Sequence, residues 1–388
     1  MSSLAENITA ILKEVSPGPV GLHEPLFNGK EWDYVKQCLD TGWVSTSGSF
    51  VEKFENQLAE FTNIPHVIAT NSGTSALHVC LELIDLKRGE EVLSPALSFV
   101  ATANAIKYCD GIPHFVDSEE RTLGVDPQKL RSYLRKETKL LYDRCWNKRT
   151  NRPIRALIVV HTFGCPVDLD PIVEICKENK LVLIEDAAES LGSYYKGRHT
   201  GNWGLLSALS FNGNKIVTTG GGGAILTRDP ELARIAKHLT TTAKLSHPWE
   251  YNHDNIGYNY RLPNINAALG CAQLEQLENF LQQKRALALR YNNLFEKLKG
   301  FRFFTEPESC KSNYWLNVLI LDRENANQMT SILELTNKSG IMTRPVWELM
   351  SSLPMYKDCP RMDLSGAEDL QRRTINIPSS PILGAKNE

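Results

Sequence analysis

The stretch HVIATNSGTSALHVCLELIDLKRGEEVLSPA, residues 66–96, decides the fold class. It begins with a short apolar run, continues with a helical segment of small and apolar residues, and ends with a second apolar run. Both runs are apolar throughout, without polar residues at alternate positions, which is typical of parallel strands buried on both faces. A strand, a helix and a strand in this order predict a βαβ unit.

The same rhythm extends along the chain to about residue 243. Further strands are predicted at 112–117, 156–161, 181–186, 206–211 and 223–227. Helices are predicted between them at 99–109, 126–136 and 170–179, and after them at 231–243. We therefore expect an α/β fold with a mostly parallel central sheet.

The rhythm changes after residue 245. A long helical stretch at 262–298 is followed by a strand at 313–321, a helix at 327–340 and a strand at 341–346, which predicts a smaller α+β domain. A chain of 388 residues suits two domains, since a domain has roughly 150 residues. We expect a large domain at 1–245, beginning with a short amphipathic helix, and a small one at 246–388.

Composition excludes several classes of function. The chain has 43 Lys and Arg against 45 Asp and Glu, a net charge of −2, so nothing indicates binding to nucleic acid or to an anionic membrane. It contains no apolar run long enough to span a bilayer and no secretory leader pattern, so we expect a cytoplasmic protein. The nine cysteines form no CxxC pair and the nine histidines are scattered, so we expect reduced cysteines and no metal site.

Ligands of doubly wound sheets bind at the carboxyl ends of the strands, so the residues found there are candidates for a site. Residues 71–75, NSGTS, follow the first strand and open a helix, where backbone N–H groups can hold a phosphate. A simple N-cap would explain the same residues. Phe99 follows the next strand, placed either to stack on a planar ring or to pack in the core.

Two further strand ends carry charged residues. Asp186 follows a buried run and suits a cationic ring nitrogen, although it could also cap the next helix; Glu189 lies three residues later. Lys215, in a loop of small residues after Ser210, could lose its proton and form a Schiff base. The glycines at 220–223 precede a strand and lack the GxGxxG spacing of dinucleotide sites. A phosphate loop, an aromatic, an aspartate and a lysine together indicate a pyridoxal phosphate (PLP) site.

In this order the parts resemble a fold-type I aminotransferase of the aspartate-aminotransferase kind. The chain is similar to the DegT/StrS family of nucleotide-sugar aminotransferases over roughly residues 20–345. The matching stretches are NSGTSAL, PALSFVATANAI, VLIEDAAES, SFNGNK, TTGGGGAI and GYNYRLPNINAALG. HEPLFNGKEWDYVKQCLDTGWVSTSG, HTFGCPVDLD and the polar segment 143–155 resemble the branch that acts in legionaminic acid synthesis. That segment is otherwise expected to be a surface insertion, or a loop at the rim of a pocket.

The resemblance implies roles for particular residues. Lys215 would bond the cofactor aldehyde, Asp186 would pair with the ring nitrogen, and Glu189 would lie near the ring hydroxyl, where the family often has Gln or His. The remaining cofactor contacts that it implies are ring stacking by Phe99, phosphate binding by Gly73, Thr74 and Ser210, and a phosphate contact by Asn259 across a homodimer interface. Gly221 stands where the family often has Glu. Sugar-nucleotide contacts are expected, by analogy, at Trp43, Lys244, Arg261, Asn313 and Trp315.

The implied reaction moves an amino group from L-glutamate to C4 of a nucleotide-linked 4-keto-6-deoxy sugar, for bacterial surface-glycan biosynthesis. In the resembling branch the acceptor is UDP-4-keto-6-deoxy-N-acetylglucosamine. GDP- and dTDP-linked acceptors, as in perosamine synthesis, remain open, as does a non-catalytic binding protein with the same fold. A related PLP 3-dehydratase is disfavoured, because such enzymes carry His in place of the lysine.

Overall fold

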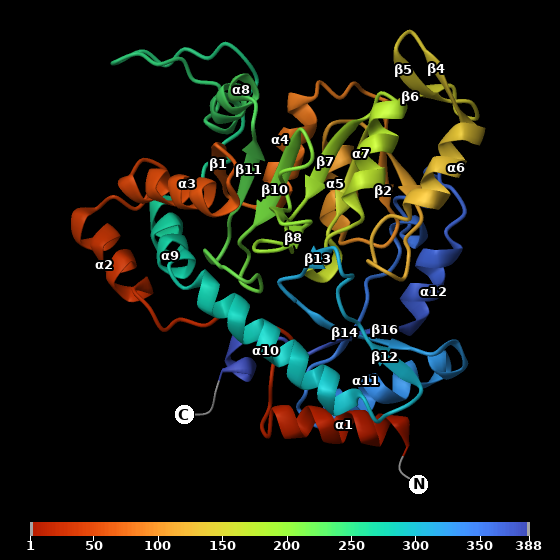
Figure 1. The fold of residues 1–388 in the computed structure, drawn as a ribbon. Helices are drawn as coiled ribbons and strands as arrows, with labels where there is room; N and C mark the ends of the chain where they lie inside the picture. Colours follow the sequence, from red (N-terminus) through yellow and green to blue (C-terminus); the bar gives the residue numbers. More distant parts are fainter. Residues whose placement is uncertain (1–2, 386–388) are drawn as a thin grey trace.

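A computed structural model describes residues 3–385, which form a large sheet with helices on both faces and a smaller sheet at the other end of the molecule (Figure 1). The strands of the large sheet are β1 (His66–Thr70), β2 (Glu91–Pro95), β3 (Ile112–Val116), β4 (Thr138–Leu141), β5 (Arg144–Asn147), β6 (Arg152–Val160), β7 (Val182–Asp186), β10 (Leu206–Ser210) and β11 (Gly223–Thr227). The expected α/β fold with a mostly parallel sheet is confirmed.

The order along the large sheet is β1-β11-β10-β7-β6-β2-β3. Neighbours from β10 to β3 run parallel, and β11 runs antiparallel to both of its partners, β1 and β10. The chain therefore brings the carboxyl ends of β1, β2, β7 and β10 to one edge, although these strands are far apart in the sequence.

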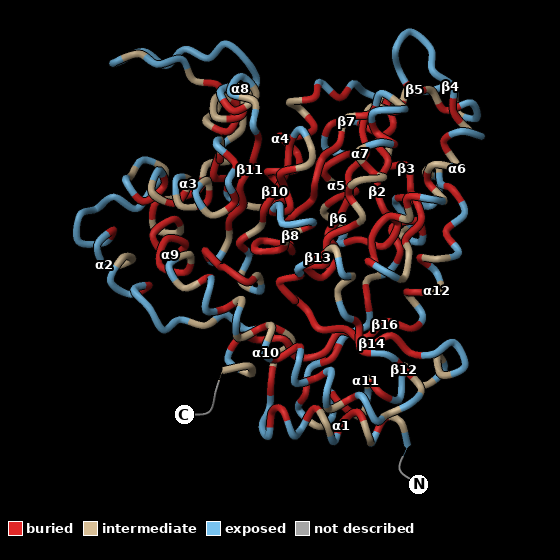
Figure 2. Tube along the Cα trace, viewed as in Figure 1, coloured by how far each residue is buried: buried red, intermediate tan, exposed pale blue. Residues whose placement is uncertain are grey.

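Both faces of this sheet are buried, because successive side chains of each strand point to opposite faces and both sets are apolar. In β6, Ala156 and Ile158 pack into one core cluster while Leu157 and Val159 pack into another. Figure 2 shows the central strands buried and the outer loops exposed. The helices around the large sheet are α2 (Glu31–Thr41), α3 (Ser49–Thr62), α4 (Gly73–Leu83), α5 (Val100–Tyr108), α6 (Pro127–Glu137), α7 (Leu169–Glu178), α8 (Pro230–Thr240) and α9 (Asn264–Leu274).

The smaller sheet is antiparallel, in the order β12-β14-β16-β15. Its strands are β12 (Phe301–Phe303), β14 (Asn317–Leu321), β15 (Arg344–Pro345) and β16 (Thr374–Ile377). A short three-stranded sheet beside it consists of β8 (Tyr194–Tyr195), β9 (Arg198–His199) and β13 (Cys310–Lys311). The helices around it are α1 (Leu4–Val15), α10 (Leu277–Phe295), α11 (Met329–Lys338) and α12 (Ser365–Arg373).

Two helices pack across the predicted domain boundary at residue 245, each with the sheet on the other side of it. The boundary itself stays a prediction. The first helix of the chain, α1, buries Ile8 and Leu12 in a cluster with Leu287 of α10 and Ile332 of α11. In the other direction, α9 shares a core with α3 and the strands β10 and β11. The predicted helical stretch 262–298 is thus two helices, α9 and α10. α10 begins in the same core as α9, with Leu277 and Phe280, and its later turns pack in the cluster of the smaller sheet.

Segment 143–155 forms structure of its own. Strands β4 and β5 make a hairpin, and β5 pairs with residues 152–154 at the beginning of β6. That is the amino end of β6, opposite to the edge where the carboxyl ends of the strands lie. The segment is therefore an extension of the sheet, not a loop at the rim of a site at the carboxyl edge.

Candidate active site

A cleft of about 380 Å³ lies at the carboxyl ends of the strands. It is lined by all seven residues expected to contact the cofactor from within the same chain: Gly73, Thr74, Phe99, Asp186, Glu189, Ser210 and Lys215. Trp315 and Trp347, from the part of the chain after residue 245, also line it. The topology of the sheet thus assembles one site from residues that lie between Asn71 and Trp347 in the sequence.

The beginning of α4 supplies free N–H groups. Ser72 caps the helix by accepting the N–H of Ser75 at 3.0 Å, and the first N–H groups of a helix have no acceptor within the helix. Gly73 lies so close to β10 that an added Cβ would come within 2.8 Å of the Ser210 Cβ. The glycine therefore lets the helix terminus and the Ser210 hydroxyl come together, an arrangement that suits a phosphate group.

Asp186 is the last residue of β7 and is buried. Its Oδ2 accepts the Thr102 hydroxyl at 2.7 Å and its Oδ1 accepts the Ala188 N–H at 3.2 Å. Burial raises the pKa of this carboxyl, although these two hydrogen bonds and the charge of Lys215 oppose the rise. A cationic ring nitrogen would supply the missing positive charge.

Glu189 lies in the same cleft and is also buried. Its Oε2 accepts the N–H of Phe163 at 2.8 Å, and its Oε1 lies 3.5 Å from the Lys215 Nζ. Burial raises the pKa of Glu189 to about 7, although the charge of Lys215 opposes the rise. Near neutral pH this carboxyl can therefore hold or release a proton.

Lys215 projects from a tight turn in which its backbone N–H donates to the Asn212 carbonyl at 2.9 Å. Its side chain is 13% exposed. The Nζ lies 3.8 Å from the centre of the Trp315 ring, and the Trp315 Nε1 donates to the Asn214 carbonyl at 2.7 Å. The indole is thus fixed to the turn that carries the lysine, and its face holds the amine in the cleft.

Phe99 immediately precedes α5 and is 54% exposed, with its ring centre 6.4 Å from that of Trp347. This exposure rules out the alternative that Phe99 packs in the core. An exposed ring that lines the cleft is available to stack on a planar ligand.

These residues fit PLP. The cofactor carries a phosphate, a ring nitrogen and an aldehyde, and the cleft offers a helix terminus with a hydroxyl, a buried carboxylate without a cation, and an enclosed lysine. Phe99 offers a free face to the ring. The arrangement therefore combines the binding groups and the proton-transferring groups that transamination requires.

Other predicted residues lie elsewhere in the chain. Asn259, Lys244 and Arg261 line a separate cavity of about 520 Å³, together with Lys237 and hydroxyl-bearing residues. Trp43 lines a third cavity of about 390 Å³. Of the five expected sugar-nucleotide contacts, only Trp315 lines the cleft within one chain.

The side chain of Asn313 is buried and occupied by backbone groups. Its Nδ2 donates to the carbonyls of Glu189 and Leu191, both at 2.9 Å, and its Oδ1 accepts the Trp315 N–H at 2.7 Å. This amide joins the two chain segments that carry Glu189 and Trp315.

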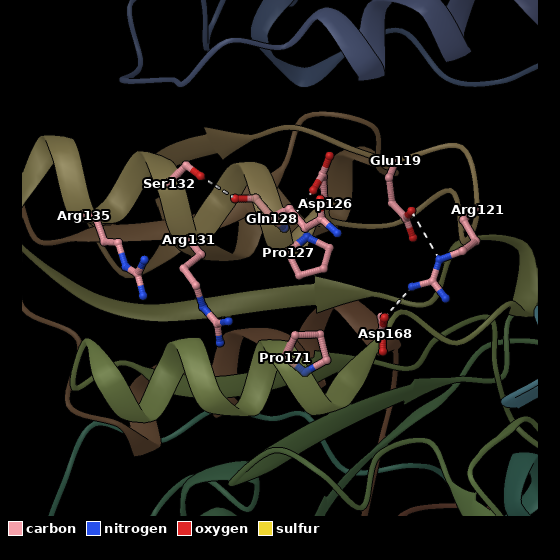
Figure 3. Close-up of a pocket in the computed structure, with 10 residues that line it drawn as sticks. All are labelled: Glu119, Arg121, Asp126, Pro127, Gln128, Arg131, Ser132, Arg135, Asp168 and Pro171. Carbon is pink, nitrogen blue, oxygen red and sulfur yellow. Dashed lines mark hydrogen bonds and ion pairs between the residues drawn. The ribbon is translucent and has the colours of Figure 1, made fainter.

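A larger cavity, about 650 Å³, lies between α6 and α7, away from the cleft (Figure 3). Two of its arginines face acids: Arg121 pairs with Glu119 and Asp168, and Arg131 pairs with Glu174 on α7. The charges of these two arginines are thus matched locally, and the cavity contains none of the residues expected to contact the cofactor.

Three contributors to the cleft were not predicted. Thr102 could have been predicted from helical spacing, because it lies three residues after Phe99 and therefore on the same side of the chain. Phe163 contributes its backbone N–H from a left-handed conformation, φ 55°, and Trp347 comes from the part of the chain after residue 245. No local pattern distinguishes those two.

Comparisons with known proteins agree with this geometry. Residues 26–387 match the DegT/DnrJ/EryC1/StrS aminotransferase family. The chain is 37% identical to GDP-perosamine synthase of Escherichia coli O157:H7 over 94% of each chain, and 33% identical to that of Caulobacter vibrioides over 93% of each. Among solved structures it superposes on Helicobacter pylori PseC, an aminotransferase of pseudaminic acid biosynthesis, with a TM-score of 0.83, 26% identity and 93% coverage of both chains.

The fold and the cleft therefore define a PLP-dependent aminotransferase that acts on nucleotide sugars. The chain belongs to the DegT/DnrJ/EryC1/StrS aminotransferase family. Within residues 3–385, no helix has the length and apolar character needed to cross a membrane.

Proposed function

We propose that the enzyme transfers the amino group of L-glutamate to C4 of a nucleotide-linked 4-keto-6-deoxy sugar, with UDP-4-keto-6-deoxy-N-acetylhexosamine as the acceptor. The observation that carries the proposal is the convergence of Lys215 and Asp186 in one cleft beside the N-terminus of α4. The UDP-linked acceptor rests on the resemblance of residues 23–48 and 161–170 to the legionaminic-acid branch.

The residues divide the work as follows. When bound, PLP supplies a ring that accepts the electron pair left when a proton leaves the donor carbon. Asp186 keeps the ring nitrogen protonated, since a buried carboxylate is stabilised by an adjacent cation. The N–H groups of Gly73 and Thr74 and the Ser210 hydroxyl bind the phosphate, while Phe99 orients the ring.

Lys215 moves the proton. As a general base, its Nζ takes the proton from the donor carbon. As a general acid, it then gives the proton to the carbon on the other side of the transferred nitrogen. Trp315 limits where this amine can reach. The Glu189 carboxyl lies 3.5 Å from the Lys215 Nζ and can share a proton with the amine near neutral pH. Donor and acceptor use one cleft in turn, so we expect ping-pong kinetics.

A GDP-linked 4-keto-6-deoxy sugar is a second candidate acceptor. The observation that favours it is the set of relatives named GDP-perosamine synthase, at 31–37% identity over 94% and 93% of this chain. The chemistry at C4 is the same for both acceptors, so the alternatives differ only in the nucleotide and the sugar substituents that the rim of the cleft must recognise.

We further propose that the enzyme is a homodimer in which Asn259 of the partner subunit reaches the cofactor phosphate. Within one chain Asn259 lines the separate cavity, beside the basic residues Lys244 and Arg261. Trp249, Tyr251 and Ile256, in the preceding segment, are large apolar side chains that are strongly exposed. A second copy of the chain would cover them and bring this cavity toward the neighbouring cleft.

The decisive experiment follows the visible absorbance of the purified protein with L-glutamate and then with candidate acceptors. We expect a yellow protein that loses its colour with L-glutamate and regains it with the UDP-linked acceptor. Recovery with a GDP-linked acceptor alone would replace the first candidate by the second. A protein that stays colourless with added PLP would overturn the proposal, and one that is yellow but indifferent to L-glutamate would overturn the donor assignment.

A further inference from the structure

Three side chains of the types that bind transition metals meet outside the cleft. His78 and Glu82 lie one turn apart on α4, and Cys109 follows the last residue of α5. The His78 nitrogen, a Glu82 carboxylate oxygen and the Cys109 Sγ all lie within 4.8 Å of one another. None of the three lines the cleft. The scattered His and Cys residues suggested no metal site, but the packing of α4 on α5 brings these three together.

The imidazole of His78 is oriented for a ligand. His78 is 6% exposed, and its Nδ1 lies 3.2 Å from the Tyr260 hydroxyl. Its Nε2 is buried without a hydrogen-bond partner in the described structure and lies 3.6 Å from the Glu82 Oε1. A metal-binding imidazole characteristically uses its second nitrogen for an outer hydrogen bond of this kind. An unpaired buried nitrogen costs free energy, which an ion at Nε2 would offset.

The donor set and its charge select the ion. We propose that His78, Glu82 and Cys109 bind a divalent transition-metal ion of the zinc class, with water in the fourth position. A thiolate, a carboxylate and a neutral imidazole carry two negative charges, which such an ion neutralises, and nitrogen, oxygen and sulfur ligands suit Zn²⁺. Binding releases the thiol proton to the buffer. The Glu82 side chain is 36% exposed, which leaves a route from solvent to the ion.

The proposed site lies between elements that matter for the cleft. α4 begins at Gly73, and the Tyr260 carbonyl accepts the N–H of Asn71, just before that helix. Tyr260, the outer partner of His78, also follows Asn259 directly. An ion would therefore tie α4 to α5 and, through Tyr260, to the segment that carries Asn259. We expect the bound ion to raise the melting temperature of the holoenzyme.

Cobalt(II) is the probe, because a thiolate bound to Co²⁺ gives a charge-transfer absorption that PLP does not. Titration of the PLP-loaded enzyme, read as a difference spectrum, should saturate at one equivalent per chain, and Zn²⁺ should displace the signal. Cys109→Ser should abolish it. Cys359→Ser is the matched control, since Cys359 is the cysteine that is not buried, and it should leave the signal unchanged.

Glu82→Gln is a second variant that tests the site if Cys109→Ser does not fold. Glu82 is partly exposed, and glutamine has nearly the same shape. It should weaken Co²⁺ binding by about 10-fold or more. The absence of a charge-transfer band, its persistence in Cys109→Ser, or an unchanged affinity in Glu82→Gln would each overturn the proposal.

Discussion

The cleft that holds Lys215 and the basic cavity that holds Asn259 are separate within a single chain, whereas the predicted site joins them across a dimer interface. The cleft collects residues that each follow a strand or begin the next helix, so the sheet fixes their relative positions. The basic cavity collects residues 237–261, from the end of α8 and the irregular segment after it, together with Thr46. Of its charged residues, Lys237 lies on α8 and Lys244 in the irregular segment, so a helix end and a loop place them.

The difference shows which half of a site a fold can complete alone. Cofactor chemistry depends on short, fixed distances, and the cleft provides them with buried hydrogen bonds such as Thr102 to Asp186 at 2.7 Å. The basic cavity is open, and exposed aromatic residues such as Trp249 lie in the segment that forms it. We expect the cleft to govern the rate of the chemical step and the cavity to govern binding.

The largest effect is expected from Lys215→Ala. Removal of the general base and acid should lower kcat by about 10²–10⁴-fold, because proton transfer then depends on water. Lys244→Ala, in the basic cavity, is the matched control and should act mainly on KM for the nucleotide sugar. Steady-state kinetics on the two variants measure the contrast, and a near-normal kcat for Lys215→Ala would remove the lysine from the mechanism.

Mixed dimers test whether the two regions meet across an interface. Lys215→Ala and Asn259→Ala subunits are each expected to be impaired alone, but a 1:1 mixture should recover about a quarter of wild-type activity, since half the dimers then hold one intact site. A mixture of Lys215→Ala with Asp186→Asn is the control, because both lesions fall in the same chain's cleft and every site stays damaged. Equal recovery in both mixtures, or none in either, would contradict the shared site.

Trp315→Leu should have an intermediate effect. The loss of the indole face 3.8 Å from the Lys215 Nζ removes a cation–π contact, worth about 1–2 kcal/mol in a desolvated setting, or about 5–30-fold in rate. We expect kcat to fall by that factor while PLP affinity changes little. If PLP affinity falls instead and kcat is preserved, Trp315 belongs to the binding surface and does not position the lysine.

The smallest effect concerns the stability of the cofactor-free protein. Burial raises the pKa of Glu189 to about 7 in the folded chain, from the usual 4.5 of an exposed glutamate. Between these values the folded chain holds a proton that the unfolded chain has lost, so stability falls as pH rises through this window. Glu189→Gln should reduce the difference in melting temperature between pH 5 and pH 8 by about 2 °C. Thermal unfolding at the two pH values measures this, and an unchanged difference would show that Glu189 is not buried as an acid.

How much the sequence revealed depends on how local each signal was. Gly73, Asp186 and Lys215 were predictable because each follows an apolar run, and parallel strands end at one edge. Phe163 was not predictable, because it contributes a backbone N–H from a left-handed conformation, and a phenylalanine side chain gives no indication of that conformation. His78 and Glu82 have a recognisable helical spacing, but Cys109 completes that cluster only through helix packing.

By itself, the sequence determined the α/β class, the order of the strands along the chain and the identity of the groups at their ends, because these follow from hydrophobic periodicity and from residue chemistry over short windows. Only the tertiary structure decided that α1 packs with α10 and α11 and that Trp315 covers Lys215. These facts depend on contacts between residues far apart in the chain, which arise from the burial of whole faces and have no signature in either segment alone.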